Sequence, residues 1–207
     1  MRIIVEEKMI KLHDVTKQIK GKTVVSDISL ELKSGDCVAI IGHNGSGKTM
    51  LLRLLCGLIT PTTGQVICDE KITFGVIIEN PTFLEHETAI YNLRYLANIR
   101  KTIDDSTIIE YLRKFNLYEA RNKKVRTFSL GMKQRLALCQ ALMEDPDVLL
   151  LDEPFNALDD DNLSIICKEI GELKAKGKII VIASHGTIPE ACCVDKTIRL
   201  SNGKIIK

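Results

Sequence analysis

The chain has 207 residues, of which 45% are hydrophobic and 27% charged, and its formal net charge is +2. This length and composition fit one globular domain or two small lobes, and the near-neutral charge gives no case for nucleic-acid binding. No apolar run is long enough to cross a membrane, and seven cysteines without a Cys-x-x-Cys spacing favour free thiols in a reducing cytoplasm.

Strands are predicted in the first part of the chain, where short apolar runs and period-two alternation recur. They are expected at Met9–His13, Ile28–Leu32, Cys37–Ile41, Gln65–Ile67 and Ile72–Ile77. One helix is expected among them, over Met50–Cys56, and Gly57 would close it.

Helices are predicted from Thr88 to about Met143, because residues that can cap a helix precede several segments of this region. Thr88 can cap Ala89–Ile99, Asp104 or Asp105 can cap Ser106–Phe115, and Ser129 can cap a helix that runs to Met143. Strand and helix then alternate, with strands at Val148–Leu151 and Lys178–Ala183, a helix at Asp160–Ala175, and a hairpin of Thr197–Leu200 and Lys204–Ile206. The pattern indicates an α/β core interrupted by a helical lobe.

A glycine-rich segment lies between the apolar run Cys37–Ile41 and the helix predicted after it. Its residues have the G-x4-G-K-T spacing of a phosphate-binding loop: Gly42, His43, Asn44, Gly45, Ser46, Gly47, Lys48 and Thr49. Glycines let backbone N–H groups approach an anion, and the positive end of the following helix adds to the attraction. Lys48 would place a charge near the β- and γ-phosphates, and Thr49 would offer a hydroxyl to Mg²⁺.

The alternative interpretation of this segment is a chance glycine-rich turn. The strand–loop–helix context, which a phosphate-binding loop requires, argues against it. We therefore expect a nucleotide site formed by the loop residues and by Met50, which follows them.

Two carboxylates follow the apolar strand Val148–Leu151. Asp152 and Glu153 would lie at the carboxyl end of a buried strand, where α/β proteins place ligand chemistry. Asp152 is placed to hold Mg²⁺ and Glu153 to polarise an attacking water. A plain strand end before Pro154 is the alternative, and the phosphate-binding loop upstream favours the catalytic interpretation.

Three further segments carry a resemblance to a known family. Phe128–Arg135 resembles the L-S-G-G-Q-x-Q-R signature of ATP-binding cassette (ABC) proteins, Asn156–Asp159 resembles their D-loop, and Ala183–His185 resembles the segment of their switch histidine. Together with the two motifs above, the resemblance extends from Leu12 to Lys204.

The resemblance implies an α/β fold with a P-loop NTPase core, which is a mixed sheet flanked by helices. An inserted α-helical lobe and an N-terminal antiparallel β portion would complete it. Residues 1–207 would form a single ABC ATPase domain, with a core lobe at about 1–80 and 146–207 and the helical lobe at about 81–145.

The resemblance also implies that two subunits sandwich two ATP molecules head to tail and hydrolyse them. Ser129, Leu130, Gly131 and Met132 of one subunit would face the γ-phosphate bound by the other, at the N-terminus of a helix. Leu130 and Met132 stand where Gly and Gln are usual in the family, whereas Ser129 and Gly131 are retained. The other expected roles are catalysis by Lys48, Glu153 and His185, Mg²⁺ binding by Thr49, Asp152 and Glu79, and a dimer contact at Asp159.

Two other positions depart from the family pattern. Ile19 stands where an aromatic residue usually stacks on adenine, so ring stacking would be lost and base selectivity altered. Glu79 stands where the Q-loop has glutamine, and a carboxylate can still ligate Mg²⁺. Ile77–Pro81 and Ser129–Leu136 resemble the ATPase subunits of bacitracin- and lantibiotic-type export or immunity transporters.

The partners that the resemblance implies are ATP, membrane-spanning permease subunits, and a second ATPase subunit, which is either the same chain or a homologous one. The chain would then be cytoplasmic and peripheral on the inner face of the cell membrane, where ATP hydrolysis drives export of a peptide antibiotic or a similar compound. A non-transport ATPase of cell division, translation or DNA maintenance is the alternative. Chromosome-maintenance members insert a long coiled coil, and the segment from Thr49 to Ser129 has no sustained heptads.

Overall fold

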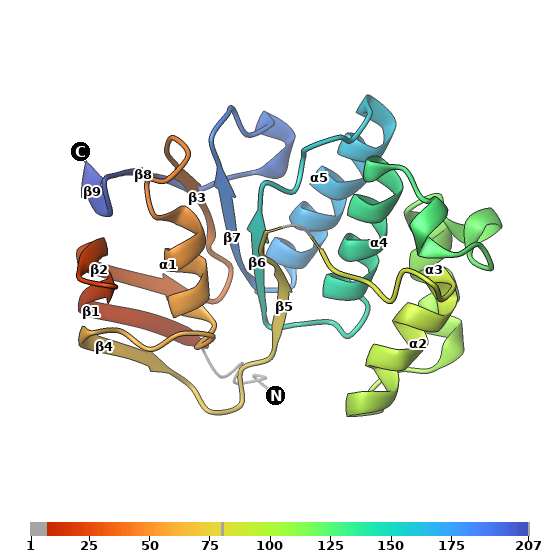
Figure 1. Ribbon diagram of the computed structural model, residues 1–207, viewed down its shortest axis with the longest axis horizontal. Coiled ribbons are helices and arrows are strands. Elements are labelled where there is room, and N and C mark those ends of the chain that lie inside the picture. The colour runs from red at the N-terminus through yellow and green to blue at the C-terminus, as the bar shows by residue number, and fades with distance from the viewer. Residues whose placement is uncertain (1–7, 80, 207) are drawn as a thin grey trace, which may run out of the picture.

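Two β-sheets, of three and six strands, organise the fold (Figure 1) within residues 8–79 and 81–206, which the computed structural model describes. The three-stranded sheet is antiparallel and has the order β2 (Lys22–Lys33), β1 (Met9–Ile19), β4 (Thr63–Cys68). The six-stranded sheet has the order β5 (Phe74–Ile77), β6 (Val148–Asp152), β7 (Ile179–Ser184), β3 (Cys37–Ile41), β8 (Lys196–Ser201), β9 (Lys204–Ile206). Its neighbours are parallel except for β8 and β9, so the sheet is mixed.

The central strands of the larger sheet are buried on both faces, which explains their continuous apolar sequences. Alternate residues of β6 enter two different hydrophobic clusters. Val148 and Leu150 pack with α1 (Lys48–Leu55) and the antiparallel sheet, whereas Leu149 and Leu151 pack with the helices on the opposite face. The sheet therefore separates two hydrophobic cores, and the carboxyl ends of its central strands are held between them.

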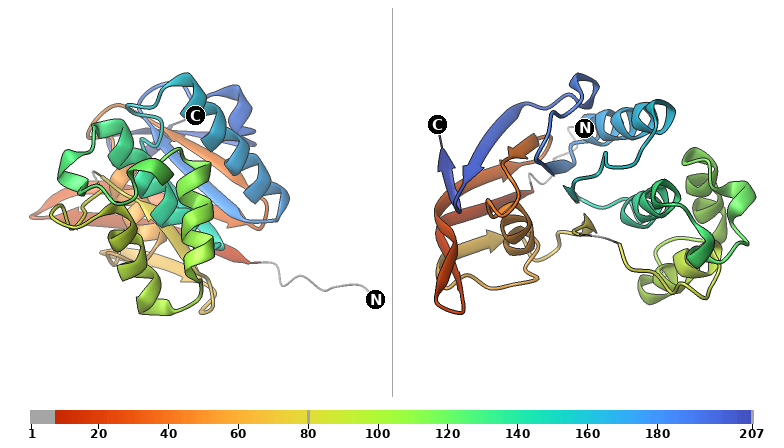
Figure 2. Two further views of the ribbon diagram at one scale, coloured as in Figure 1. Left: turned by 90° about the vertical axis from the view of Figure 1, so that its right-hand side faces the viewer. Right: turned by 45° about the horizontal axis from the view of Figure 1, so that its top comes forward.

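Helices cover the larger sheet on the face opposite α1. These are α4 (Leu130–Leu142) and α5 (Asp160–Ala175), while α2 (Ala89–Arg100) and α3 (Asp105–Lys114) lie farther from the sheet (Figures 1 and 2). Three short 3₁₀ helices complete the described elements: η1 (Tyr118–Ala120), η2 (Val125–Thr127) and η3 (Glu190–Cys192). The helices α2, α3 and α4 thus form a helical insertion between β5 and β6, as the predicted fold class requires.

The capping residues predicted from the sequence begin the helices of this insertion. The side chains of Thr88, Asp104 and Ser129 each accept a hydrogen bond from a backbone N–H in the first turn of α2, α3 and α4. Of the two candidates for α3, Asp104 is the cap, and Asp105 lies inside the helix. Each cap satisfies one of the donors that a helix leaves unpaired at its start.

The first two strands are longer than predicted. The expected strand Met9–His13 continues to Ile19 and turns at Lys20 and Gly21 into β2, which was expected only at Ile28–Leu32. Asp14 and Asp27 have positive φ angles of 50° and 53°, and the pairing register shifts beside them. These irregularities break the period-two alternation that marks a strand in sequence.

The first helix also begins earlier than predicted, at Lys48 rather than Met50, because its first turn is the end of the phosphate-binding loop. Within residues 8–79 and 81–206, no helix combines the length and apolar character needed to span a membrane.

Candidate nucleotide site

The glycine-rich loop connects β3 to α1 and is folded tightly on its surroundings. A Cβ built on Gly42 would lie 2.3 Å from the carbonyl oxygen of Leu200, and one on Gly47 would lie 2.7 Å from that of Val24. Gly47 also has a φ of 106°, which a residue with a side chain rarely adopts. Glycine is therefore required at both positions by the packing and conformation of the loop itself.

The beginning of α1 leaves hydrogen-bond donors for an anion. Its N-cap, Gly47, supplies no capping side chain, and its first turn contains no acidic residue. Ser46 Oγ is buried without a hydrogen-bond partner among the described residues. An uncapped helix N-terminus with an unpaired hydroxyl beside it is suited to phosphate oxygens.

Lys48 lies inside the loop with only 6% of its surface exposed. Its Nζ donates hydrogen bonds to the carbonyl oxygens of Gly42, at 2.7 Å, and His43, at 3.4 Å, and lies 3.7 Å from Glu153 Oε1. The ammonium group is thus held by backbone acceptors and faces the catalytic carboxylate proposed from the sequence.

Thr49 and Asp152 meet between the start of α1 and the end of β6. Thr49 Oγ1 donates a 2.6 Å hydrogen bond to Asp152 Oδ2. Burial raises the pKa of Asp152 above its ordinary value, and the hydrogen bond from Thr49 opposes that shift. The hydroxyl and the carboxylate are hard oxygen donors in contact, which is the chemistry that Mg²⁺ prefers when water and substrate phosphate complete its shell. No cluster of three or more potential His, Cys, Asp or Glu ligands occurs in the described part of the chain.

Glu153 is held in a strained backbone conformation next to His185. Its φ is 51°, and its backbone N–H donates to the carbonyl oxygen of Ala183 at 2.9 Å. Its carboxylate accepts hydrogen bonds from the backbone N–H of His185, at 2.8 Å, and from Ser184 Oγ, at 3.3 Å. His185 Nδ1 also lies 2.8 Å from Glu153 Oε1. The end of β7 therefore fixes the orientation of this carboxylate.

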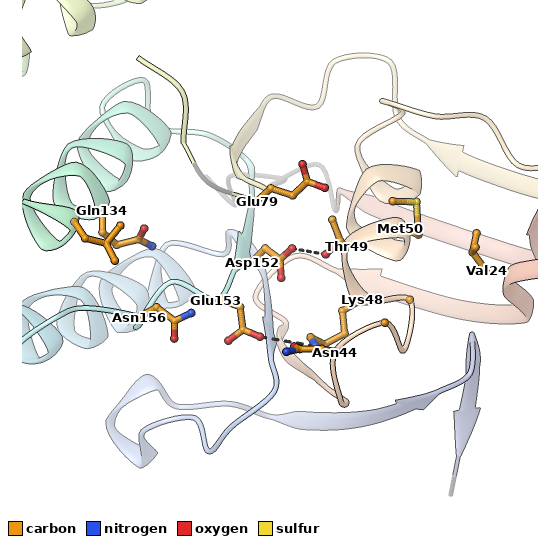
Figure 3. Close-up of a pocket in the computed structure, with 13 residues that line it drawn as sticks. Val24, Asn44, Lys48, Thr49, Met50, Glu79, Gln134, Asp152, Glu153 and Asn156 are labelled. Carbon is orange, nitrogen blue, oxygen red and sulfur yellow. Dashed lines mark hydrogen bonds and ion pairs between the residues drawn. The ribbon is translucent and has the colours of Figure 1, made fainter. Parts of the chain in front are cut away.

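These groups surround a pocket of about 640 Å³ (Figure 3). Its lining includes most of the predicted nucleotide and metal residues, namely Asn44, Gly45, Gly47, Lys48, Thr49, Met50, Glu79 and Asp152, and also the predicted catalytic residue Glu153. Three residues without a predicted role also line it, namely Val24, Gln134 and Asn156. Gln134 and Asn156 fall within the signature and D-loop segments quoted above, whereas no sequence signal marks Val24.

Other predicted residues lie outside this pocket. Ile19 is at the end of β1 with 41% of its surface exposed. Gly42, His43 and His185 line a neighbouring cavity of about 850 Å³. Ser46 is buried within the loop.

Two residues of the signature segment, Leu130 and Gln134, line the pocket, and Leu130 is 65% exposed. Ser129 Oγ accepts a 3.3 Å hydrogen bond from the Met132 N–H and so caps α4. Gly131 lies against the carbonyl oxygen of Ala157. The structure therefore presents the start of α4 at the pocket, and only Leu130 of the four signature residues lines it.

Asp159, predicted at the dimer interface, caps α5 in this chain. Its Oδ1 accepts hydrogen bonds from the backbone N–H of Asn162, at 2.9 Å, and from the Asn162 side chain, at 2.6 Å. These hydrogen bonds hold the pKa of Asp159 below its usual value.

Glu79 faces the pocket and pairs with the helix of the phosphate-binding loop. Its Oε1 lies 2.8 Å from an Arg53 guanidinium nitrogen, and its φ is 62°. The side chain is thus engaged by a cation on α1, in addition to lining the pocket with Thr49 and Asp152.

Comparison with known proteins places these features in one family. The profile of the ABC transporter family matches residues 25–156. YybJ of Bacillus subtilis, an uncharacterised ABC transporter ATP-binding protein, is 38% identical over 95% of this chain and 94% of its own length. SrtF of Streptococcus pyogenes, a lantibiotic transport ATP-binding protein, is 32% identical over 86% of this chain and 80% of its own length.

Solved structures agree with these matches. The dimeric bacterial ABC transporter cassette MJ0796 is 26% identical and superposes with a TM-score of 0.85, over 96% of this chain and 97% of that one. A dimeric post-hydrolysis state of the same cassette, bound to ADP and Pi, has a TM-score of 0.86 at the same identity and coverage.

Proposed function

Because the chain belongs to the ABC transporter family, as an ATP-binding subunit and an ATPase, we propose that the pocket between the glycine-rich loop and the end of β6 is its ATP site. The observation that carries this assignment is the convergence of five side chains from three distant parts of the sequence. Thr49 contacts Asp152, and Lys48 faces Glu153, which in turn is bound by His185.

In the proposed mechanism the loop binds the phosphates and the acidic strand activates water. Backbone N–H groups at the start of α1 and the Lys48 ammonium stabilise the negative charge on the β- and γ-phosphates. The Glu153 carboxylate accepts a hydrogen bond from the attacking water and takes its proton as the water oxygen bonds to the γ-phosphorus, while the bond from that phosphorus to the bridging oxygen breaks and ADP leaves. His185 and the end of β7 keep that carboxylate oriented.

Magnesium is the metal that these residues fit. Thr49 and Asp152 would hold it, with Glu79 as a further candidate ligand, and bound Mg²⁺ would neutralise charge on the phosphates of the substrate.

The dimer is the second part of the proposal. A partner subunit, either this chain or a homologous one, would bring Ser129, Leu130, Gly131 and Met132 to the γ-phosphate, with Asp159 near the interface. The exposed Leu130 and the absence of acidic residues from the first turn of α4 are compatible with such a contact. The solved cassette MJ0796, which has a similar fold, is dimeric, and this supports the arrangement.

We further propose that the chain works on the inner face of the cell membrane with separate permease subunits. Its similarity to SrtF, which is described as a lantibiotic transport protein, supports a peptide antibiotic or a similar compound as the exported substrate. The relatives described as ABC transporter ATP-binding proteins favour transport over a role in cell division, translation or DNA maintenance.

Two measurements test this proposal. The purified chain should hydrolyse ATP only with Mg²⁺, and Lys48→Ala should lose nucleotide binding because the phosphates lose their charged contact. Affinity purification from detergent-solubilised membranes should recover a membrane protein with several spans in stoichiometric amount. Recovery of ribosomes or DNA instead would contradict the transport assignment.

A further inference from the structure

The ion pair between Arg53 and Glu79 connects the helix of the phosphate-binding loop to the opposite wall of the pocket. Arg53 lies one turn beyond Thr49 on α1, so both side chains project from the same side of the helix. The guanidinium nitrogen is 2.8 Å from Glu79 Oε1. Figure 3 shows Glu79 beside Thr49 and Asp152, which are the residues proposed to hold the metal.

The backbone of Glu79 is held in an unfavourable conformation. Its φ of 62° lies in the left-handed region. This conformation raises the free energy of any residue that has a side chain. The side chain, which is 58% exposed, is held by the ion pair with Arg53, itself 30% exposed.

The charges around the pocket give this ion pair a specific consequence. Asp152, Glu153 and Glu79 line the pocket, and Lys48 is the single basic residue among the described residues of its lining. ATP brings several more negative charges to the same place, so an unpaired third carboxylate would repel it. The Arg53 guanidinium neutralises the negative charge of the Glu79 carboxylate and holds that carboxylate against the wall of the pocket.

We propose that Arg53 is a positioning residue for nucleotide binding, which acts by neutralising Glu79 and keeping its carboxylate away from the phosphates. The inference rests on the proposed function, because it assumes that the pocket receives ATP. An exposed ion pair contributes little to folding, so its loss should appear in nucleotide affinity and leave thermal stability nearly unchanged. The effect of removing Arg53 should also depend on the charge at position 79.

A double-mutant cycle measures this dependence. ATP affinity is determined by calorimetry at low salt, in EDTA and then in excess Mg²⁺, for the wild type, Arg53→Met, Glu79→Gln and the double variant. In EDTA, Arg53→Met should bind ATP about fivefold to tenfold more weakly, as expected for one uncompensated charge near the phosphates. Glu79→Gln should bind at least as well as the wild type, and the double variant should match Glu79→Gln.

Two controls separate this role from general effects. Arg94→Met removes an exposed arginine that pairs with Asp105 on the helical insertion, and it should leave ATP affinity unchanged. Arg53→Lys keeps the positive charge and should retain most of the affinity, and it serves as the folded reference if Arg53→Met is unstable. Adding salt should reduce the difference between Arg53→Met and the wild type.

The possible results distinguish the inference from the function on which it rests. An Arg53→Met variant that binds ATP like the wild type overturns the role of Arg53 and leaves the ATP site intact. A double variant as weak as Arg53→Met also overturns it, since Arg53 would then act independently of Glu79. A folded wild type that binds no ATP overturns the proposed function and this inference with it.

Discussion

Gly131 and Ala157 are in backbone contact: a Cβ built on Gly131 would lie 2.6 Å from the carbonyl oxygen of Ala157. This contact joins the start of α4 to the loop that follows Glu153, and the 3.3 Å hydrogen bond from Gln134 Nε2 to the Pro154 carbonyl reinforces it. The family resemblance assigns Gly131 to the phosphate of a partner subunit. The structure adds a requirement within the chain, because only glycine lets the two segments approach this closely.

We expect Gly131→Ala to displace either α4 or the loop after β6. Overpacking of this kind costs about 1–3 kcal/mol of unfolding free energy, measured by urea denaturation. ATP hydrolysis should fall more than stability alone explains, because the displaced loop directly follows Glu153, the proposed general base. Gly171→Ala is the matched control: its Cβ would meet nothing within 4 Å. On α5 it should raise stability by about 0.5–1 kcal/mol, and a stabilising Gly131→Ala would contradict the contact.

The sequence predicted the parts of the fold that depend on local signals. Thr88, Asp104 and Ser129 cap helices because a side-chain oxygen can reach the first turn from that position alone. The sequence did not predict the full length of the first hairpin, because the positive φ angles of Asp14 and Asp27 depend on pairing between strands. Local propensity carries no information on such a register shift.

The sequence likewise predicted some features of the candidate site and did not predict others. The phosphate-binding loop and the acidic strand end were visible as motifs, and the structure brings them together. Val24 lines the pocket because the β1–β2 hairpin folds over the loop, and the partner of Glu79 is Arg53, which no motif marks. Both positions depend on tertiary contacts between segments, and neither Val24 nor Arg53 belongs to a recognisable sequence motif.

Base recognition by Ile19 stays a prediction. Ile19 is exposed at the end of β1 and does not line the pocket, whereas Val24, on the neighbouring strand, does. If the adenine reaches the end of β1, Ile19→Tyr should add ring stacking worth about 1 kcal/mol, or about fivefold in ATP affinity. Preference for ATP over GTP should rise with it. Calorimetry on both proteins checks this, and equal affinities would remove Ile19 from the adenine contacts.

Asp147 should make stability depend on pH. Burial alone would raise its pKa, but hydrogen bonds from Lys8 and Thr73 outweigh burial and hold the pKa below the ordinary value of 3.8. A carboxylate with a lowered pKa stabilises the folded state above its unfolded pKa and loses that contribution as pH falls through the folded pKa. At pH 7, Asp147→Asn should therefore lower the unfolding free energy by about 1.5–3 kcal/mol, the range for hydrogen bonds to a charged group.

The difference between Asp147→Asn and the wild type should shrink as the pH falls below about 4, which urea denaturation at several pH values measures. Asp145→Asn is the matched control two residues away. Its carboxylate is 66% exposed and pairs with Lys178, so its loss should cost at most about 1 kcal/mol. A difference for Asp147→Asn that stays constant across this range would show that the charge of Asp147 is not responsible.

Glu153→Gln tests the catalytic assignment and the dimer together. The substitution keeps the size of the side chain, and its amide oxygen can still accept the hydrogen bond from the His185 N–H. It removes the basic carboxylate, so hydrolysis should fall by about 10²-fold or more, as expected for the loss of a general base. ATP binding should persist because Lys48, Thr49 and Asp152 are unchanged. With the γ-phosphate uncleaved, an ATP-dependent dimer should accumulate, and light scattering with and without ATP measures it.

Two further variants test separately whether the dimer depends on the start of α4 and on nucleotide binding. Adding Ser129→Arg should abolish the dimer, because Ser129 caps α4 and a bulky side chain there would obstruct the helix N-terminus that we propose faces the partner's phosphate. Lys48→Ala should lose nucleotide binding first and therefore show no dimer at any ATP concentration. A Glu153→Gln protein that hydrolyses ATP at the wild-type rate would contradict the role of Glu153. One that binds ATP, fails to hydrolyse it and stays monomeric would keep the catalytic role and argue against self-pairing, which favours a homologous partner or a dimer that forms only on the permease.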